Sequence, residues 1–189
     1  MNFQPERNCD AERIGQILAI AAQDAASGVQ AIDAALAQFP DDPRLHFLKG
    51  SLLIGLRRHI GAHAELTRAV DLDPHYAIAR FQLGFFELTS GEADAARATL
   101  APLLDLPEGH YLRHFAQGLD SLVRDRFDEC IASLRAGQRA NVENEPLNRD
   151  MELIIEKCRG LVSPADSAYD EISATSLLLR SPGFGSKLH

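Results

Sequence analysis

Apolar residues along this chain recur at the spacing of a helix rather than that of a strand. No stretch alternates apolar and polar residues with β-branched enrichment over more than a few positions, so strand signals are lacking. Alanine and leucine, which both favour helix, dominate the composition. One apolar helix face is formed by Leu147, Met151, Ile154, Ile155 and Cys158. The pattern therefore predicts an all-helical chain.

A single constant shift along the chain superimposes small and apolar positions several times over. Three series share this register: Gly50, Gly84 and Gly118; Ala62, Ala96 and Cys130; and Leu66, Leu100 and Leu134. The shift is 34 residues in every series. A fixed period of this length indicates stacked copies of one supersecondary unit, here a pair of antiparallel helices. We expect the small residue in the first helix of each pair to let the second helix approach closely.

This pattern resembles the tetratricopeptide repeat, which combines Leu-Gly, an Ala-x3-Phe pair and a closing proline. The third repeat carries Leu83-Gly84 followed by Ala96 and Leu100, while in the second repeat Lys49 replaces the usual leucine. The resemblance implies an all-α, right-handed superhelical solenoid of antiparallel helix pairs. It also implies binding of another protein or a peptide as the default function.

The register divides the chain into an array over residues 1–162 and a C-terminal region. We expect four repeats, at about 9–42, 43–76, 77–110 and 111–143, and a capping helix at 146–160. A further helix is predicted at 163–181, with a flexible tail at 182–189 where helix breakers accumulate. Asp42 before Pro43 and Asp73 before Pro74 predict helix starts, and Gly61 and Gly91 predict the turns inside the second and third repeats.

The family geometry places positions 2, 5, 9 and 12 of each repeat in a concave groove. Together with Tyr76, the candidate binding residues from these positions are Phe47, Ser51, Ile54, Tyr76, Ile78, Phe81, Phe85, Leu88, Phe115, Leu119 and Leu122. Chaperone-binding members of the family hold a C-terminal carboxylate with Lys and Asn at positions 5 and 9. Neither Lys nor Asn stands at positions 5 and 9 of the second to fourth repeats. The predicted groove is therefore apolar and suits an amphipathic helix or an extended apolar peptide.

Charge and cysteine usage narrow the partners and the compartment. The formal net charge is −8 and no long basic run occurs, which argues against nucleic-acid binding. The three cysteines form no CxxC pair, so we expect a reducing, cytoplasmic setting without a disulfide framework. No segment has the roughly 18–20 uninterrupted apolar residues of a membrane span, and no signal pattern opens the chain.

Motifs for catalysis or for binding a cofactor are lacking. The sequence contains no HExxH, no GxSxG and no GxxxxGK[ST]. His59 with His63 and His110 with His114 have the i, i+4 spacing of metal ligands, but neither pair has a third ligand nearby in the sequence. We therefore expect no enzyme activity, no cofactor and no metal site.

Two hypotheses for function remain open on these observations. The first is a protein-interaction module (an adaptor, a scaffold or a chaperone-like protein) that takes an apolar segment in its groove. The second is an assembly subunit that forms a homodimer through the helix at 163–181, or that fills the groove with this helix of its own. The apolar groove positions motivate both, because so much aromatic surface is unusual on a monomer.

Overall fold

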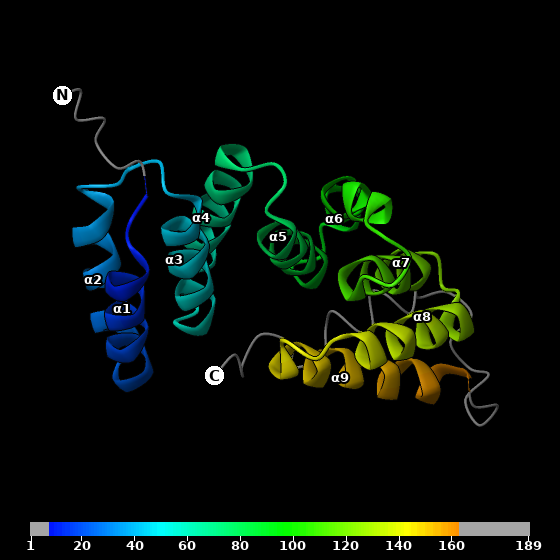
Figure 1. Ribbon diagram of the computed structural model, residues 1–189. Coiled ribbons are helices and arrows are strands. Elements are labelled where there is room, and N and C mark those ends of the chain that lie inside the picture. Colours follow the sequence, from blue (N-terminus) through cyan, green and yellow to red (C-terminus); the bar gives the residue numbers. More distant parts are fainter. Residues whose placement is uncertain (1–7, 163–189) are drawn as a thin grey trace. The chain divides into compact units, whose positions relative to one another are not determined.

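The computed structural model describes residues 8–162, which form nine α-helices and one 3-10 helix without a strand in that range (Figure 1). The predicted all-α class is confirmed. These residues fall into two units, 8–83 and 84–162, and the division lies inside the fifth helix. The predicted segments at 163–181 and 182–189 lie outside the described residues.

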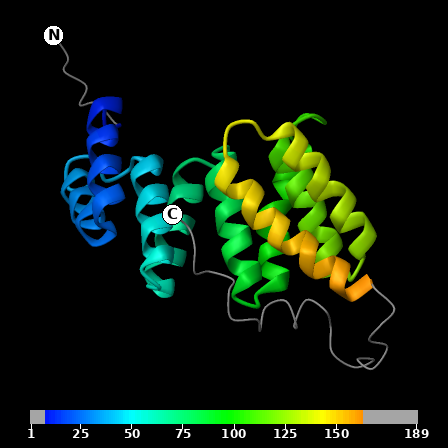
Figure 2. The same cartoon turned by 90° about the horizontal axis from the view of Figure 1, so that it is seen from below.

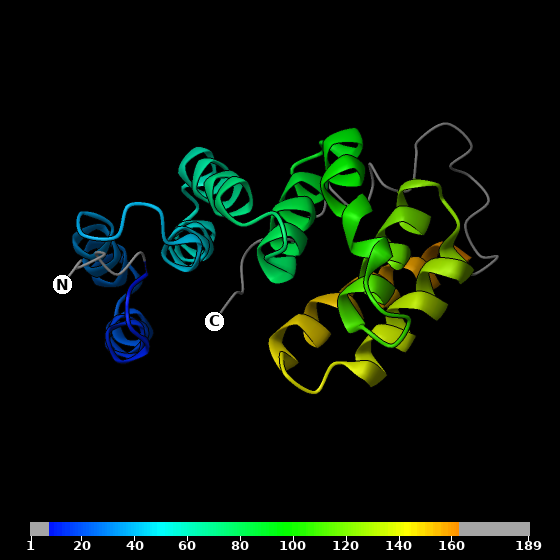
Figure 3. The same cartoon turned by 45° about the horizontal axis from the view of Figure 1, so that its top comes forward.

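Unit 1 contains two antiparallel helix pairs and the first half of a further helix. Its elements are α1 (Ala11–Gln23), α2 (Ala25–Leu36), α3 (Pro43–Gly55), α4 (His59–Leu72) and the start of α5 (Ala77–Thr89). Asp10, Asp24 and Asp42 cap the first three helices, each accepting a backbone N–H of the first turn. α3 and α4 lie side by side (Figures 1 and 3).

Unit 2 completes the third repeat and adds a fourth repeat and a terminal helix. Beyond the end of α5, its elements are α6 (Ala93–Leu100), the 3-10 helix η1 (Ala101–Asp105), α7 (Tyr111–Val123), α8 (Phe127–Ala140) and α9 (Glu145–Val162). α9 runs alongside α8 (Figure 2). The apolar face predicted for this helix is buried, with Met151, Ile155 and Cys158 at 0% exposure.

Three glycines at the same position of successive repeats allow the two helices of a repeat to meet closely. A Cβ added to Gly50 would lie 2.7 Å from Cγ of Leu66, and one added to Gly84 would lie 2.5 Å from Cγ of Leu100. At Gly118 the nearest atom would be Cδ2 of Leu134, also at 2.5 Å. The close approach predicted from the repeat register is therefore confirmed.

The turn inside each repeat also follows the register, although not at both glycines predicted. Arg57, Gly91 and Asp125 occupy equivalent positions in successive repeats, and all three have positive φ, at 57°, 90° and 55°. Gly91 is where the sequence placed its turn, whereas Gly61 lies inside α4. The prediction for Gly61 was wrong because the second repeat makes its left-handed turn with Arg57, a residue type that carries no signal for this conformation.

The start of α5 also differs from the sequence prediction. The helix begins at Ala77 rather than at Pro74. Asp73 ends α4 in an extended conformation, and its carboxylate accepts the backbone N–H of His75 at 2.9 Å. The backbone N–H of Tyr76 also donates to the carbonyl oxygen of Asp73 at 3.0 Å, so residues 73–76 form a separate turn and the helix starts only after it.

Lys49, which replaces a leucine of the family pattern, is held in unit 1 by two carboxylates. Its Nζ lies 2.6 Å from Oε1 of Glu65 and 2.8 Å from Oδ1 of Asp33. Glu65 also pairs with His46 through a 2.6 Å contact between Oε2 and Nδ1. The charged side chain is thus accommodated by ion pairs at a position that the family fills with an apolar residue.

Candidate functional site

The structure separates the eleven predicted groove residues by exposure. Six are buried: Ile54, Phe81, Leu88, Phe115, Leu119 and Leu122. Five are half-buried and reach the surface: Phe47, Ser51, Tyr76, Ile78 and Phe85. A binding surface needs accessible atoms. Only the five half-buried residues could therefore contact a partner without rearrangement of the helices.

Phe115 illustrates why a groove position becomes a core position. Its ring packs against Gly137 of α8, where even a Cβ would overlap it, and it meets Tyr111 edge-on with ring centroids 5.8 Å apart. The missing side chain at Gly137 gives the ring space inside the fourth repeat. A role for this ring in a groove stays a prediction.

Phe47 and Tyr76 form the aromatic centre of the accessible surface in unit 1. Phe47 lies on α3, and Tyr76 directly precedes α5. Their ring centroids are 5.3 Å apart, and the planes are tilted by 60°. Tilted pairs at this distance are favourable, so each ring holds the other in place.

One polar contact, between Ser51 and Gln82, joins the α3 and α5 parts of this surface. The Ser51 hydroxyl contacts Oε1 of Gln82 at 3.2 Å and the carbonyl oxygen of Phe47 at 2.9 Å. Gln82 was not among the predicted site residues, because its role depends on a partner in another helix that no local pattern connects to it. We define the aromatic surface as Phe47, Ser51, Tyr76, Ile78 and Gln82.

A buried carboxylate anchors the beginning of α3, from which Phe47 projects. Asp42 is 0% exposed and accepts the backbone N–H of Cys9 at 2.8 Å and Nη2 of Arg44 at 2.7 Å. Burial alone would raise the pKa of Asp42, but hydrogen bonds from Arg44 and Cys9 hold it below its ordinary value. Burial also raises the pKa of Tyr76, so its phenol keeps its proton at neutral pH.

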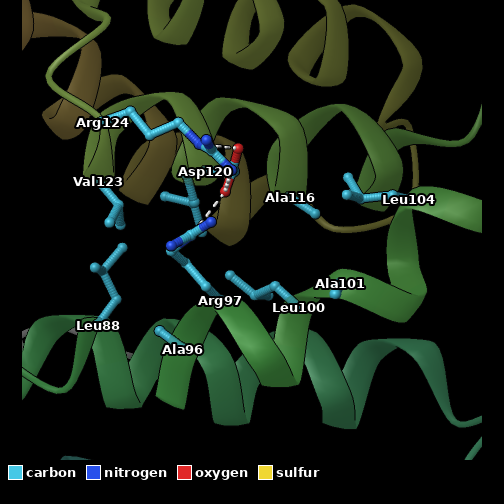
Figure 4. Close-up of a pocket in the computed structure, with 11 residues that line it drawn as sticks. Leu88, Ala96, Arg97, Leu100, Ala101, Leu104, Ala116, Asp120, Val123 and Arg124 are labelled. Carbon is cyan, nitrogen blue, oxygen red and sulfur yellow. Dashed lines mark hydrogen bonds and ion pairs between the residues drawn. The ribbon is translucent and has the colours of Figure 1, made fainter. Parts of the chain in front are cut away.

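Unit 2 contains a pocket that the sequence reasoning missed. Arg97, Leu100 and Leu104 line one side of it, and Asp120 and Arg124 line the other (Figure 4). Asp120 and Arg124 are four residues apart, a spacing that predicts an ion pair on one face of a helix. The approach of Arg97 to the same carboxylate comes from a different helix and has no local sequence signature.

Residues 8–162 contain neither a cluster of possible metal ligands nor a helix able to span a bilayer. No group of three or more His, Cys, Asp or Glu side chains in that range could hold a metal ion. His110, one of the candidate ligands, instead caps α7 by accepting the backbone N–H of Leu112 at 3.2 Å. No described helix is both long and apolar enough to cross a bilayer.

A family model described as Tetratricopeptide repeat matches residues 53–108. The match begins near the end of α3 and runs to just before α7, so it includes α5, α6 and η1, the helices of the third repeat. No curated protein matches the chain.

Proposed function

We propose that this chain, in which residues 53–108 match a tetratricopeptide-repeat model, binds an apolar peptide or an amphipathic helix through the aromatic surface of unit 1. Repeats of this family generally mediate protein–protein interactions. The adaptor, scaffold and chaperone-like roles are versions of this proposal. The family is typically non-enzymatic, and we propose no catalytic role.

The three free thiols, all buried, support our further proposal of a reducing, cytoplasmic setting.

The observation that carries the proposal is the half-buried pair of Phe47 and Tyr76. Aromatic side chains that are held in place supply a large contact area at little cost in conformational entropy. Ile78 extends this apolar area from α5, while Ser51 and Gln82 add polar groups beside it. Apolar centres with a few polar groups suit one face of an amphipathic helix, whose anchors recur every three or four residues.

A displayed library of random peptides offers a direct test with the full chain. Peptides selected on the wild-type protein are expected to carry apolar residues at spacings of three and four, and to lose binding to Phe47→Asp and Ile78→Asp. Ile60→Asp is the matched control, since Ile60 is 91% exposed but lies outside the aromatic surface. Equal loss in the control variant, or no loss in the two surface variants, would overturn the proposal, with folding of each variant checked by circular dichroism.

The alternative of a self-associating assembly subunit depends on the segment at 163–181, which lies outside the described residues. Light scattering on the full chain and on a chain ending at residue 162 separates the two. A dimer that becomes a monomer on truncation favours the assembly role, whereas an unchanged monomer favours the interaction module.

A further inference from the structure

The pocket in unit 2 exists where the second helix of the third repeat stops early. α6 ends at Leu100, after eight residues, while α4 and α8 each run for 14. Pro102 cannot donate the backbone hydrogen bond that another helical turn needs, and the chain continues as η1. The early end of α6 leaves a cavity of about 180 Å³ between α6–η1 and α7.

The lining of this pocket is mainly apolar. Leu88, Leu100 and Leu119 are buried, and short alanine side chains at 96, 101 and 116 leave space between them. Leu88 and Val123 point toward one another across the cavity (Figure 4). Leu104 is 36% exposed and belongs to the accessible part of the lining.

The edge of the pocket carries an excess of positive charge. Arg97 Nε lies 3.1 Å from Oδ1 of Asp120, and Arg124 Nε lies 2.9 Å from Oδ2 of the same carboxylate (Figure 4). Arg126, which does not line the pocket itself, approaches Oδ2 of Asp120 at 3.8 Å and pairs with Glu129 at 2.9 Å. Three guanidinium groups thus share two carboxylates, in a protein whose formal net charge is −8.

The size of the cavity limits what can occupy it. Pockets for small-molecule ligands measure roughly 300–1,000 Å³, whereas an apolar cavity of about 150 Å³ holds a molecule the size of benzene. The cavity of this protein therefore fits one aliphatic side chain rather than a cofactor or a metabolite. The remaining positive charge at its edge suits a carboxylate next to that side chain.

We propose that this pocket is a second docking site, which takes a leucine-sized side chain of a partner protein with an aspartate or glutamate beside it. The apolar side chain fills the space that α6 leaves, and the neighbouring carboxylate accepts hydrogen bonds from Arg97 and Arg124. The site is independent of the aromatic surface of unit 1, so either surface can function if the other does not.

The test uses the full chain and three capped dipeptides: Ac-Leu-Asp-NH₂, Ac-Leu-Asn-NH₂ and Ac-Ala-Asp-NH₂. Methyl NMR is expected to show shifts at Leu100, Leu104 and Val123 with the first probe, and binding of the other two about tenfold weaker. Affinity for the first probe should fall as salt is raised. Absence of shifts at these three residues, or equal affinity for all three probes, would rule the site out.

Variants of the protein separate the two parts of the site. Ala101→Phe fills the cavity from an exposed wall position and is expected to abolish binding without disturbing the core. Arg97→Gln should weaken Ac-Leu-Asp-NH₂ about tenfold and leave Ac-Leu-Asn-NH₂ unchanged. Arg149→Gln, at an arginine whose side chain is 73% exposed on α9, is the matched control for charge. An effect of Arg149→Gln equal to that of Arg97→Gln would show that the protein's overall charge, not the pocket, drives binding.

Discussion

The two units have the same helix-pair repeat but treat a desolvated aspartate in opposite ways. In unit 1, Asp42 is fully buried and receives hydrogen bonds from the backbone of Cys9 and from Arg44. In unit 2, Asp150 of α9 receives no hydrogen bond from the described residues, and burial raises its pKa to about 6. Burial alone therefore does not set the pKa of a carboxyl group, because the hydrogen-bond donors around it decide whether the pKa is raised or lowered.

The second helices of the repeats show the same contrast. α4 of unit 1 runs uninterrupted, while α6 of unit 2 gives way to η1 and leaves a pocket. α8 of unit 2 keeps the 14-residue length of α4, so the departure from the regular pattern lies in the third repeat, where α6 has eight residues. Departures of this kind tend to mark sites kept for function, which is why the pocket rather than the regular region carries the second docking proposal.

The largest loss of stability is expected when the buried carboxylate of unit 1 is removed. Asp42→Ala leaves Arg44 and the backbone N–H of Cys9 without their acceptor and takes away the cap of α3, so the free energy of unfolding should fall by about 3–4 kcal/mol. Denaturant unfolding of both proteins measures this difference in the free energy of unfolding. Asp41→Ala, at a neighbour with a 68% exposed side chain, should change stability by less than about 1 kcal/mol. Similar losses in both variants would contradict the anchoring role.

Leu103 should prove to be the residue that holds η1 in unit 2. It is 2% exposed and occupies the repeat position of Ala69, so Leu103→Ala should cost about 3 kcal/mol. The adjacent Leu104, which is 36% exposed, provides the comparison, and Leu104→Ala should cost less than about 1 kcal/mol. Thermal unfolding with matched calorimetry distinguishes them. If the two losses are equal, η1 is not anchored by its buried leucine.

Removing the charge of Asp150 should stabilise the protein. The pKa of about 6 in the fold exceeds the usual unfolded value of about 3.9, so ionisation costs stability as pH rises from about 4 to 6. Asp150→Asn should add about 2 kcal/mol at pH 7–8 and nothing below pH 4. The lowered pKa of Asp42 acts in the opposite sense, since its contribution is present at neutral pH and is lost on strong acidification. No gain in the free energy of unfolding of Asp150→Asn at pH 7–8, measured by denaturant unfolding, would contradict this prediction.

The smallest effect is expected where the units are alike. Gly50→Ala and Gly84→Ala each force a Cβ against a leucine of the facing helix, and both should cost about 1–2 kcal/mol after the gain in helix propensity. Gly15→Ala has no neighbouring atom within 4 Å and should instead stabilise α1 by up to about 1 kcal/mol. A clear difference between Gly50→Ala and Gly84→Ala would mean that the two helix pairs are packed differently.

The helix pairs could be predicted from the sequence because their contacts repeat. Gly84 and Leu100 are close in the chain and recur one repeat later as Gly118 and Leu134, so one rule describes both contacts. The burial of Phe115 could not be predicted, since it depends on the absent side chain of Gly137 rather than on the groove position of the ring. The pocket was also missed, because the proline that creates it breaks the repeat rule on which the prediction relied.

All three cysteines of the chain are buried, and they lie in different units: Cys9 in unit 1, and Cys130 with Cys158 in unit 2. A buried thiol reacts with a labelling reagent only when the structure around it opens. The sulfur atoms of Cys130 and Cys158 lie 3.8 Å apart between α8 and α9, so detachment of α9 would expose both together. The rate of thiol modification thus reports local opening in each unit separately, and mass spectrometry of the labelled chain reads out both rates without any added probe.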